Sequence, residues 1–169
     1  MPKEIVNRVA NSQLKTIDLE ELYPQGTRTI IDIKEWLFQE LILKEVDFRK
    51  HLNDHDWSQY ENHYVALTCS TDAIIPSWAF MLIRTHLFPF AKKVVVGNLT
   101  ALETSIFHTI IANFNIDEYK NNPVIIKGCA NKPIPKTTFI QLIEKLQPVV
   151  KSIMFGEACS TVPLYKKGN

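Results

Sequence analysis

The stretch HYVALTCSTDAIIPSWAFMLIRTHLFPFAKKVVV, residues 63–96, decides the fold. Its first six residues are apolar and β-prone, residues 75–88 have the length of a helix, and residues 93–96 are mostly β-branched. A strand, a helix and a second strand in this order are typical of a βαβ unit with two parallel strands. The stretch therefore predicts an α/β protein with a mainly parallel sheet.

The same alternation continues toward the C-terminus. Residues 100–114 and 136–146 carry apolar side chains at helical spacing, and residues 124–127 and 149–155 are apolar runs of strand length. Strands that are apolar throughout are typical of a sheet covered on both faces. We therefore expect a three-layer α/β sandwich with four parallel strands and three crossover helices. The only repeat expected is this alternation, with a period of roughly thirty residues.

The first sixty residues follow a different pattern, but no linker rich in Pro, Gly or Ser separates them from the rest. We expect a single domain of residues 1–169, in which residues 1–60 form an α+β extension packed on the parallel βα core of residues 61–169. The extension contains two candidate strands and two candidate helices, which are residues 14–19, 28–33, 34–43 and 46–53.

Composition excludes several classes of protein. The 169 residues are 46% hydrophobic and 22% charged, and the net charge is +1, as in an ordinary globular protein. The sequence has no basic stripe, so we expect no nucleic-acid partner. The most apolar stretch, residues 73–83, is too short for a membrane span and contains Pro76. The motifs GxxxxGK[ST], GxGxxG, GxSxG and HExxH are absent.

The N-terminus has no apolar core of the kind that a secretory signal requires, so we expect a cytoplasmic protein. Thiols remain reduced in that compartment, and three cysteines are an odd number for a disulfide framework. We therefore expect the cysteines to be free thiols or metal ligands.

Each cysteine follows a predicted strand. Cys69 comes directly after residues 63–68, Cys129 comes after residues 124–127 and one glycine, and Cys159 comes shortly after the last strand. Ligands bind at the carboxyl edge of open parallel sheets because the βα loops collect there. We therefore expect the three thiols to form one site.

Polar residues beside these thiols are candidate additional ligands or lining residues: Asp72, Glu157, Ser70, Ser160, Lys127 and Lys132. Three thiolates suit an iron–sulfur cluster with one open iron, or zinc completed by a carboxylate or water. For a protein prepared in air, we expect the absence of a cofactor to be as compatible with the sequence as an iron–sulfur cluster or zinc.

Two other classes stay open, and the sequence does not decide whether the protein is an enzyme. Cys69 at a helix N-terminus suits a cysteine-dependent enzyme acting on a small molecule, although no base is identified and the catalytic residues are unknown. A non-catalytic interaction module is the other class. The sequence leaves open the oligomeric state, the substrate and the identity of the metal.

Long segments of the chain also resemble a known family. These segments are residues 56–60, 65–82, 90–99, 127–133 and 148–166. They are similar to an uncharacterised bacterial domain-of-unknown-function family, number 2480. The resemblance covers nearly the whole chain and implies no established activity. It implies a role near iron–sulfur cluster biogenesis, as an accessory factor in cluster assembly or transfer with iron–sulfur assembly proteins as partners.

Overall fold

The computed structural model describes residues 13–128, 131–157 and 160–168. The chain forms two compact units. Unit 2 is continuous and runs from Pro24 to Ile106, whereas unit 1 contains the residues up to Tyr23 and those from Phe107 onward. Unit 2 is therefore inserted into unit 1, and each unit has its own sheet.

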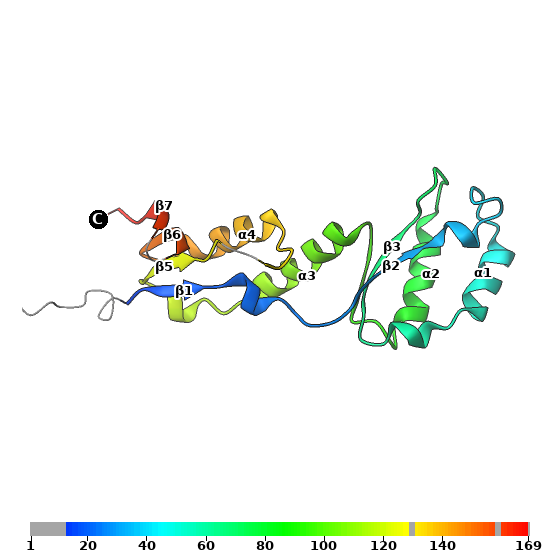
Figure 1. The fold of residues 1–169 in the computed structure, drawn as a ribbon, viewed down its shortest axis with the longest axis horizontal. Helices are drawn as coiled ribbons and strands as arrows, with labels where there is room; N and C mark the ends of the chain where they lie inside the picture. The colour runs from blue at the N-terminus through cyan, green and yellow to red at the C-terminus, as the bar shows by residue number, and fades with distance from the viewer. Residues whose placement is uncertain (1–12, 129–130, 158–159, 169) are drawn as a thin grey trace, which may run out of the picture. The chain divides into compact units, whose positions relative to one another are not determined.

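Unit 2 is built on a three-stranded parallel sheet in the order β2-β3-β4, of which Figure 1 labels β2 and β3. Its strands are β2 (Arg28–Asp32), β3 (Tyr64–Thr68) and β4 (Lys93–Val96). The 3₁₀-helix η2 (Ile33–Trp36), the helix α1 (Glu45–Asp54) and the 3₁₀-helix η3 (Trp57–Tyr60) join β2 to β3. The helix α2 (Ser77–Leu87) joins β3 to β4.

One face of this sheet carries the core of unit 2. β3 is apolar along its centre because both faces of the middle strand are buried. The indole N–H of Trp57 donates a hydrogen bond of 2.7 Å to the Leu52 carbonyl, which satisfies a polar group inside the core. The largest contributions come from β2, α1, η3, β3 and α2, through Ile31, Phe48, Leu52, Trp57, Tyr60, Val65, Leu67, Ile83 and Leu87.

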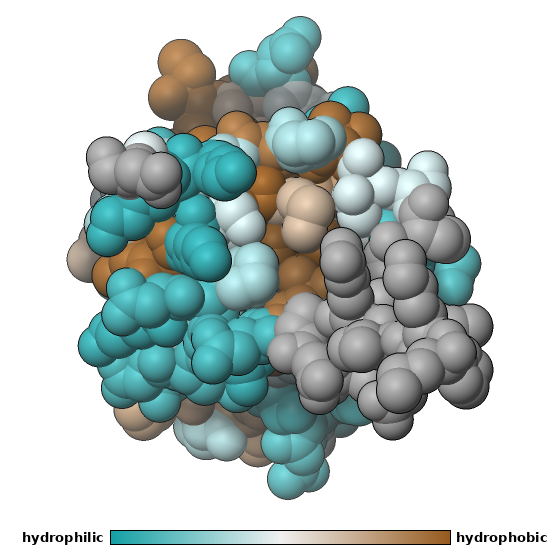
Figure 2. All heavy atoms as spheres, turned by 90° about the vertical axis from the view of Figure 1, so that its left-hand side faces the viewer, coloured by the Kyte–Doolittle hydropathy of each residue, from teal (hydrophilic) through white to brown (hydrophobic). Residues whose placement is uncertain are grey.

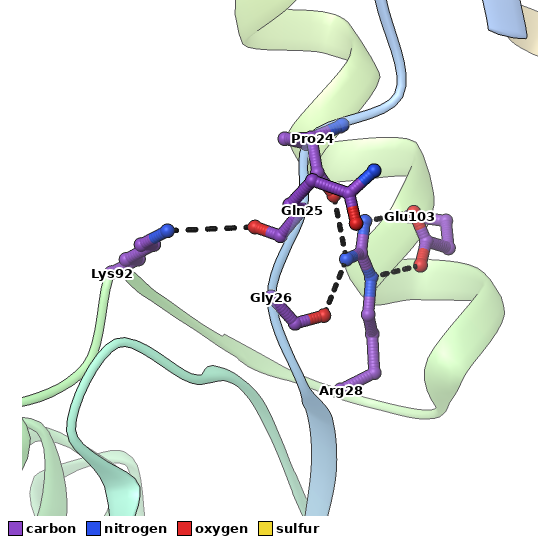
Figure 3. Close-up of polar contacts among 6 residues, drawn as sticks. All are labelled: Pro24, Gln25, Gly26, Arg28, Lys92 and Glu103. Carbon is purple, nitrogen blue, oxygen red and sulfur yellow. Dashed lines mark hydrogen bonds and ion pairs between the residues drawn. The ribbon is translucent and has the colours of Figure 1, made fainter.

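A buried ion pair closes the start of unit 2 (Figure 3). Arg28 Nε lies 2.7 Å from Glu103 Oε1, and the two side chains are only 12% and 6% exposed. Arg28 Nη1 also donates to the carbonyl oxygens of Pro24 and Gly26, at 2.8 and 2.7 Å. Arg28 therefore fixes the segment that enters unit 2 to the helix by which the chain leaves it, α3 (Leu99–Asn113).

Unit 1 is built on a four-stranded sheet in the order β1-β5-β6-β7. The first three strands, β1 (Lys15–Ile17), β5 (Pro123–Ile126) and β6 (Ser152–Glu157), are parallel, and β7 (Ser160–Lys166) is antiparallel to β6. The 3₁₀-helix η1 (Leu19–Leu22) follows β1, η4 (Asp117–Tyr119) precedes β5, and α4 (Lys136–Leu146) joins β5 to β6. The core consists mainly of aliphatic side chains: Ile17, Leu19, Ile111, Val124, Ile126, Leu142, Leu146, Val150 and Ile153.

The predicted α/β fold class with mainly parallel strands is confirmed. The prediction that all strands share one sheet is wrong, because they divide between two. Residues 34–43 do not form the expected α-helix: they form η2 and a tight turn with Gln39 and Glu40 at positive φ. The helix α3 is capped by Asn98, whose Oδ1 accepts from the Ala101 N–H at 2.9 Å. The prediction of a single domain is untested and stays a prediction.

The two units repeat one structure, with equivalent residues fifty-nine positions apart from α1 to the end of β4. Asn62 and Asn121 both have positive φ, at 62° and 59°, and so do Gly97 and Gly156, at 140° and 122°. The strand registers also agree: Val65 pairs with Val94, as Val124 pairs with Ile153. Identical pairs include Phe48 and Phe107, Tyr60 and Tyr119, Pro76 and Pro135, Leu87 and Leu146, Pro89 and Pro148, and Lys92 and Lys151.

The first strands of the two units are also equivalent, but their matching residues are fourteen positions apart in the sequence. Ile17 is the last residue of β1 and Ile31 is the last buried residue of β2, and they pair with Ile126 and Leu67. An aspartate then caps a 3₁₀-helix in each case: Asp18 accepts from Glu20 N–H at 3.0 Å, and Asp32 accepts from Lys34 N–H at 3.1 Å. The sequence analysis missed this repeat because it considered only the shorter βα period.

Candidate functional site

The three cysteines predicted to share a metal site follow strands of two different sheets. Cys69 follows β3 in the sheet of unit 2, whereas β5 and β6, the strands that precede Cys129 and Cys159, lie in the other sheet. Cys129 and Cys159 themselves are outside the described residues. Within the part of the chain that the structure describes, no group of three or more His, Cys, Asp or Glu side chains could hold a metal ion. The predicted metal-binding function is therefore wrong. The prediction assumed that all the strands form one sheet, whereas they form two.

The loop after β3 is held by its own polar contacts. Half-buried Cys69 has its Sγ 3.3 Å from Thr71 Oγ1, and that hydroxyl donates to the Glu40 carbonyl at 2.7 Å. The Ser70 N–H donates to Asp32 Oδ1 at 3.1 Å. Burial raises the pKa of Asp32, but the hydrogen bonds from Ser70 and Lys34 outweigh it and lower the pKa below its ordinary value. The Cys69 thiol thus contacts the hydroxyl group of Thr71, which is itself bonded to the main chain.

The remaining predicted residues are exposed or serve the frame of unit 1. Lys127 Nζ lies 3.2 Å from Asp18 Oδ2, and the hydrogen bond to that carboxylate raises the pKa of Lys127. The main-chain N–H of Lys132 donates to Glu20 Oε1 at 3.2 Å. Asp72 in unit 2, and Glu157 and Ser160 at the turn between β6 and β7, are exposed.

The repeat identifies a different candidate site, which is the outer edge of β4. In unit 1 the equivalent edge, that of β6, is covered by β7 in antiparallel pairing. The paired residues are Ser152 with Lys166, Ile153 with Tyr165, Met154 with Pro163, and Phe155 with Val162. In unit 2, β4 pairs with β3 alone among the described residues. The edge of β4 is therefore open where its counterpart is closed.

The main chain of β4 is oriented as that of β6 is. The Lys92 N–H donates to the His63 carbonyl at 2.8 Å, and the equivalent Lys151 N–H donates to the Asn122 carbonyl at 2.9 Å. At the end of the strand, the Gly97 N–H donates to the Leu67 carbonyl at 2.8 Å. Because successive residues of a strand direct their main-chain groups to opposite sides, the N–H and C=O of Val95 face β3, and those of Val94 and Val96 point away from it. Ile153 and Phe155, the equivalents of Val94 and Val96, lie opposite Tyr165 and Val162 of β7. Val94 and Val96 thus present donors and acceptors to an incoming strand.

The chain diverges after the shared glycine. Gly156 and Glu157 still pair with Thr161 and Ser160 of β7, whereas Gly97 leads into Asn98, which caps α3. A helix so close to the end of β4 carries the chain away from the edge, and no other segment within the described ranges pairs with it. The open edge therefore follows from the local sequence Gly97-Asn98.

One flank of α2 borders this edge. In unit 1 the rings of Phe139 and Phe155 meet edge to face, with centroids 5.8 Å apart, which places position 139 over the last core residue of β6. The equivalent residues in unit 2 are Phe80 and Val96. Val94 and Phe80 both pack on the core of unit 2, while Val96 is 57% exposed. An apolar shelf, formed by Phe80, Val94 and Val96, thus lies beside the open edge.

Exposed apolar side chains are not by themselves diagnostic. Figure 2 shows a face on which apolar side chains lie between hydrophilic ones, as is normal for soluble domains. The site at β4 is identified by its unpaired main chain and by the comparison with β6. The signal that the sequence analysis missed is the match between positions fifty-nine apart. That match aligns KKVVVG of residues 92–97 with KSIMFG of residues 151–156.

Comparisons with known proteins give a family but no function. No helix among the described residues is long and apolar enough to cross a membrane. No curated protein and no solved structure shows significant similarity to the chain. One family model matches residues 3–167, which is nearly the whole chain. The chain therefore belongs to the family described as protein of unknown function (DUF2480).

Proposed function

We propose that the protein is an interaction module that binds an extended segment of a partner protein at the outer edge of β4. The partner segment pairs antiparallel to β4, as β7 pairs with β6. The observation that supports the proposal is that one repeat covers this edge with a strand and the other leaves it open. Strand addition of this kind obtains its affinity from main-chain hydrogen bonds and its specificity from alternate side chains.

The test uses a synthetic strand. The probe is a capped peptide with the β7 sequence of residues 160–166, in which Lys166→Gln removes a positive charge that would lie opposite Lys93. Titration of the ¹⁵N-labelled full chain with this peptide is expected to shift the Val96 amide resonance saturably. The bound peptide is also expected to protect this amide from hydrogen exchange.

Two variants at one position separate the main chain from the side chain. Val96→Pro removes an outward N–H and leaves the hydrogen bonds to β3 in place, so it is expected to abolish binding. Val96→Thr keeps the N–H and the β-branched shape, so it is expected to bind as the wild type does. Far-ultraviolet circular dichroism of both variants checks that the fold is retained.

Three results would contradict the proposal. The first is no saturable shift in the wild type. The second is binding that survives Val96→Pro. The third is a wild-type dimer in sedimentation that Val96→Pro dissociates, because the edge would then bind a second copy of the chain.

A further inference from the structure

We infer that the partner strand carries a carboxylate side chain opposite Val94, where Arg84 of α2 binds it. The inference depends on the proposed strand addition at β4 and adds the chemical class of the residue that is recognised. It follows from the position of Arg84, from the state of its guanidinium group, and from the charges around it.

Arg84 lies on the flank of α2 that borders β4. The opposite flank faces α1, since Trp78, Leu82 and Thr85 line a groove of about 420 Å³ together with Glu45 and Arg49 of α1. Residues four apart lie on the same side of a helix. Arg84 therefore shares its side with Phe80, one turn away, over the shelf beside β4.

Unit 1 shows what an added strand places at this position. The equivalent of Arg84 is Ile143, and the equivalent of Val94 is Ile153. Tyr165 of β7 lies opposite Ile153, and both Tyr165 and Ile143 pack on the core of unit 1. A residue of an added strand opposite Val94 would accordingly project toward the α2 side, beside Arg84. Arginine in place of isoleucine changes the preferred neighbour from an apolar ring to an anion.

The guanidinium group of Arg84 has a hydrogen-bond donor that no described residue accepts from. Its Nη1 is buried and has no hydrogen-bond partner among the described residues. Its charged centre lies 5.2 Å from the ring centroid of Phe88, which is itself 73% exposed. A buried N–H without an acceptor is costly and rare, so an acceptor that arrives with a partner would remove that cost.

The surroundings favour a carboxylate over a neutral acceptor. Residues 73–102, which include all of α2 and β4, contain no Asp or Glu. The same segment contains Arg84, His86, Lys92 and Lys93, so its charges are all basic. A carboxylate can accept two parallel hydrogen bonds from arginine, and this geometry makes the pair stronger than a neutral contact.

The experiment compares two peptides with two proteins. Both peptides have the β7 sequence with Lys166→Gln, and they differ only in Tyr165→Glu or Tyr165→Gln. Affinities are measured by fluorescence anisotropy with the full-length wild type and with Arg84→Met, which keeps the length of the side chain and removes the charge. The wild type is expected to prefer the glutamate peptide by about tenfold or more, and Arg84→Met is expected to bind both peptides equally.

A matched control corrects for net charge. Lys50→Met removes one exposed cation from α1 and is expected to keep the tenfold preference. Equal binding of both peptides to the wild type would overturn the inference and leave the proposed function intact. A preference that persists in Arg84→Met, or disappears in Lys50→Met, would also overturn it, because general attraction would then be the cause. Failure of both peptides to bind would instead refute the strand addition itself.

Discussion

Unit 1 and unit 2 share one order of strands and helices and one strand register, yet their sheets end differently. Unit 1 adds β7 to its last parallel strand, with Pro163 in that outermost position, and proline is a common protection of sheet edges. Unit 2 leaves β4 open and surrounds it with basic residues. Within one chain, the first unit thus provides a model of what the second unit is suited to bind.

The units also differ in how their cores are filled. In unit 2, Trp36, His55 and Trp57 form a cluster of rings, with centroids 4.6–5.9 Å apart. The corresponding positions in unit 1 are Leu22, Phe114 and Ile116. The same backbone therefore tolerates two kinds of core, and the strand and helix positions are set by which residues are buried rather than by their identity.

The largest loss of stability is expected when the ion pair between Arg28 and Glu103 is broken. Unit 1 has no equivalent pair, because Leu14 takes the place of Arg28. Glu103→Gln leaves Arg28 charged and buried, and it is expected to destabilise unit 2 by about 3–5 kcal/mol. Urea unfolding followed by circular dichroism measures the loss. The double variant Arg28→Met and Glu103→Leu removes both charges and is expected to recover most of the stability. A neutral effect of Glu103→Gln would show that the pair does not stabilise unit 2.

Equivalent core residues test whether the units unfold separately. Leu87 and Leu146 are both completely buried, so each change to alanine is expected to cost about 3 kcal/mol. Native-state hydrogen exchange should show faster exchange in β3 and α2 for Leu87→Ala, and in β5 and α4 for Leu146→Ala. Faster exchange throughout the chain for either variant would mean that both units unfold together, as the predicted single domain requires.

The sequence was sufficient to predict most strands and helices, but not which strands pair with one another. Runs such as residues 94–96 and 124–126 are apolar throughout, so their assignment as strands needs only local information. Pairing is a long-range property: Ile17 pairs with Ile126, across the whole of unit 2, and no local pattern indicates that. β7 was missed because Val162, Pro163 and Leu164 are exposed at an edge and lack the pattern of a buried strand.

The candidate site was missed for a related reason. Side-chain chemistry points to the cysteines, whereas the edge of β4 is defined by main-chain groups that every residue carries. Gly97 and Gly156 both have positive φ, and the paths of the two units diverge after them.

Smaller losses of stability are expected at the two aspartates that cap η1 and η2. Asp18→Ala and Asp32→Ala each remove a side-chain acceptor at the start of a 3₁₀-helix, at a cost of about 1 kcal/mol. Since the pKa of Asp32 is lowered in the folded protein, its contribution is present above the ordinary pKa of 3.8 and is lost as the pH falls through the folded value. Urea unfolding at pH 7 and pH 3 measures this loss, which Asp32→Asn should not show. An unchanged pH response in Asp32→Asn would assign the loss to other carboxylates.

The smallest expected effect exchanges one residue of unit 2 for its counterpart. His55 stacks on Tyr60 with centroids 5.6 Å apart, as Phe114 stacks on Tyr119 at 5.7 Å, so His55→Phe should fit the site.

Burial lowers the pKa of His55 below 6.5, and the unfolded chain therefore binds a proton more readily than the folded chain. Stability from this group is complete above pH 6.5 and declines as the pH falls toward the folded pKa. His55→Phe removes the hydrogen bond of 2.8 Å between His55 Nε2 and the Tyr60 hydroxyl, but it also removes the titration. Urea unfolding between pH 8 and pH 5 is expected to show a smaller loss of stability in His55→Phe than in the wild type. Equal losses would place the pH response in the other histidines, and unit 2 would then differ from unit 1 in shape at this position but not in its response to acid.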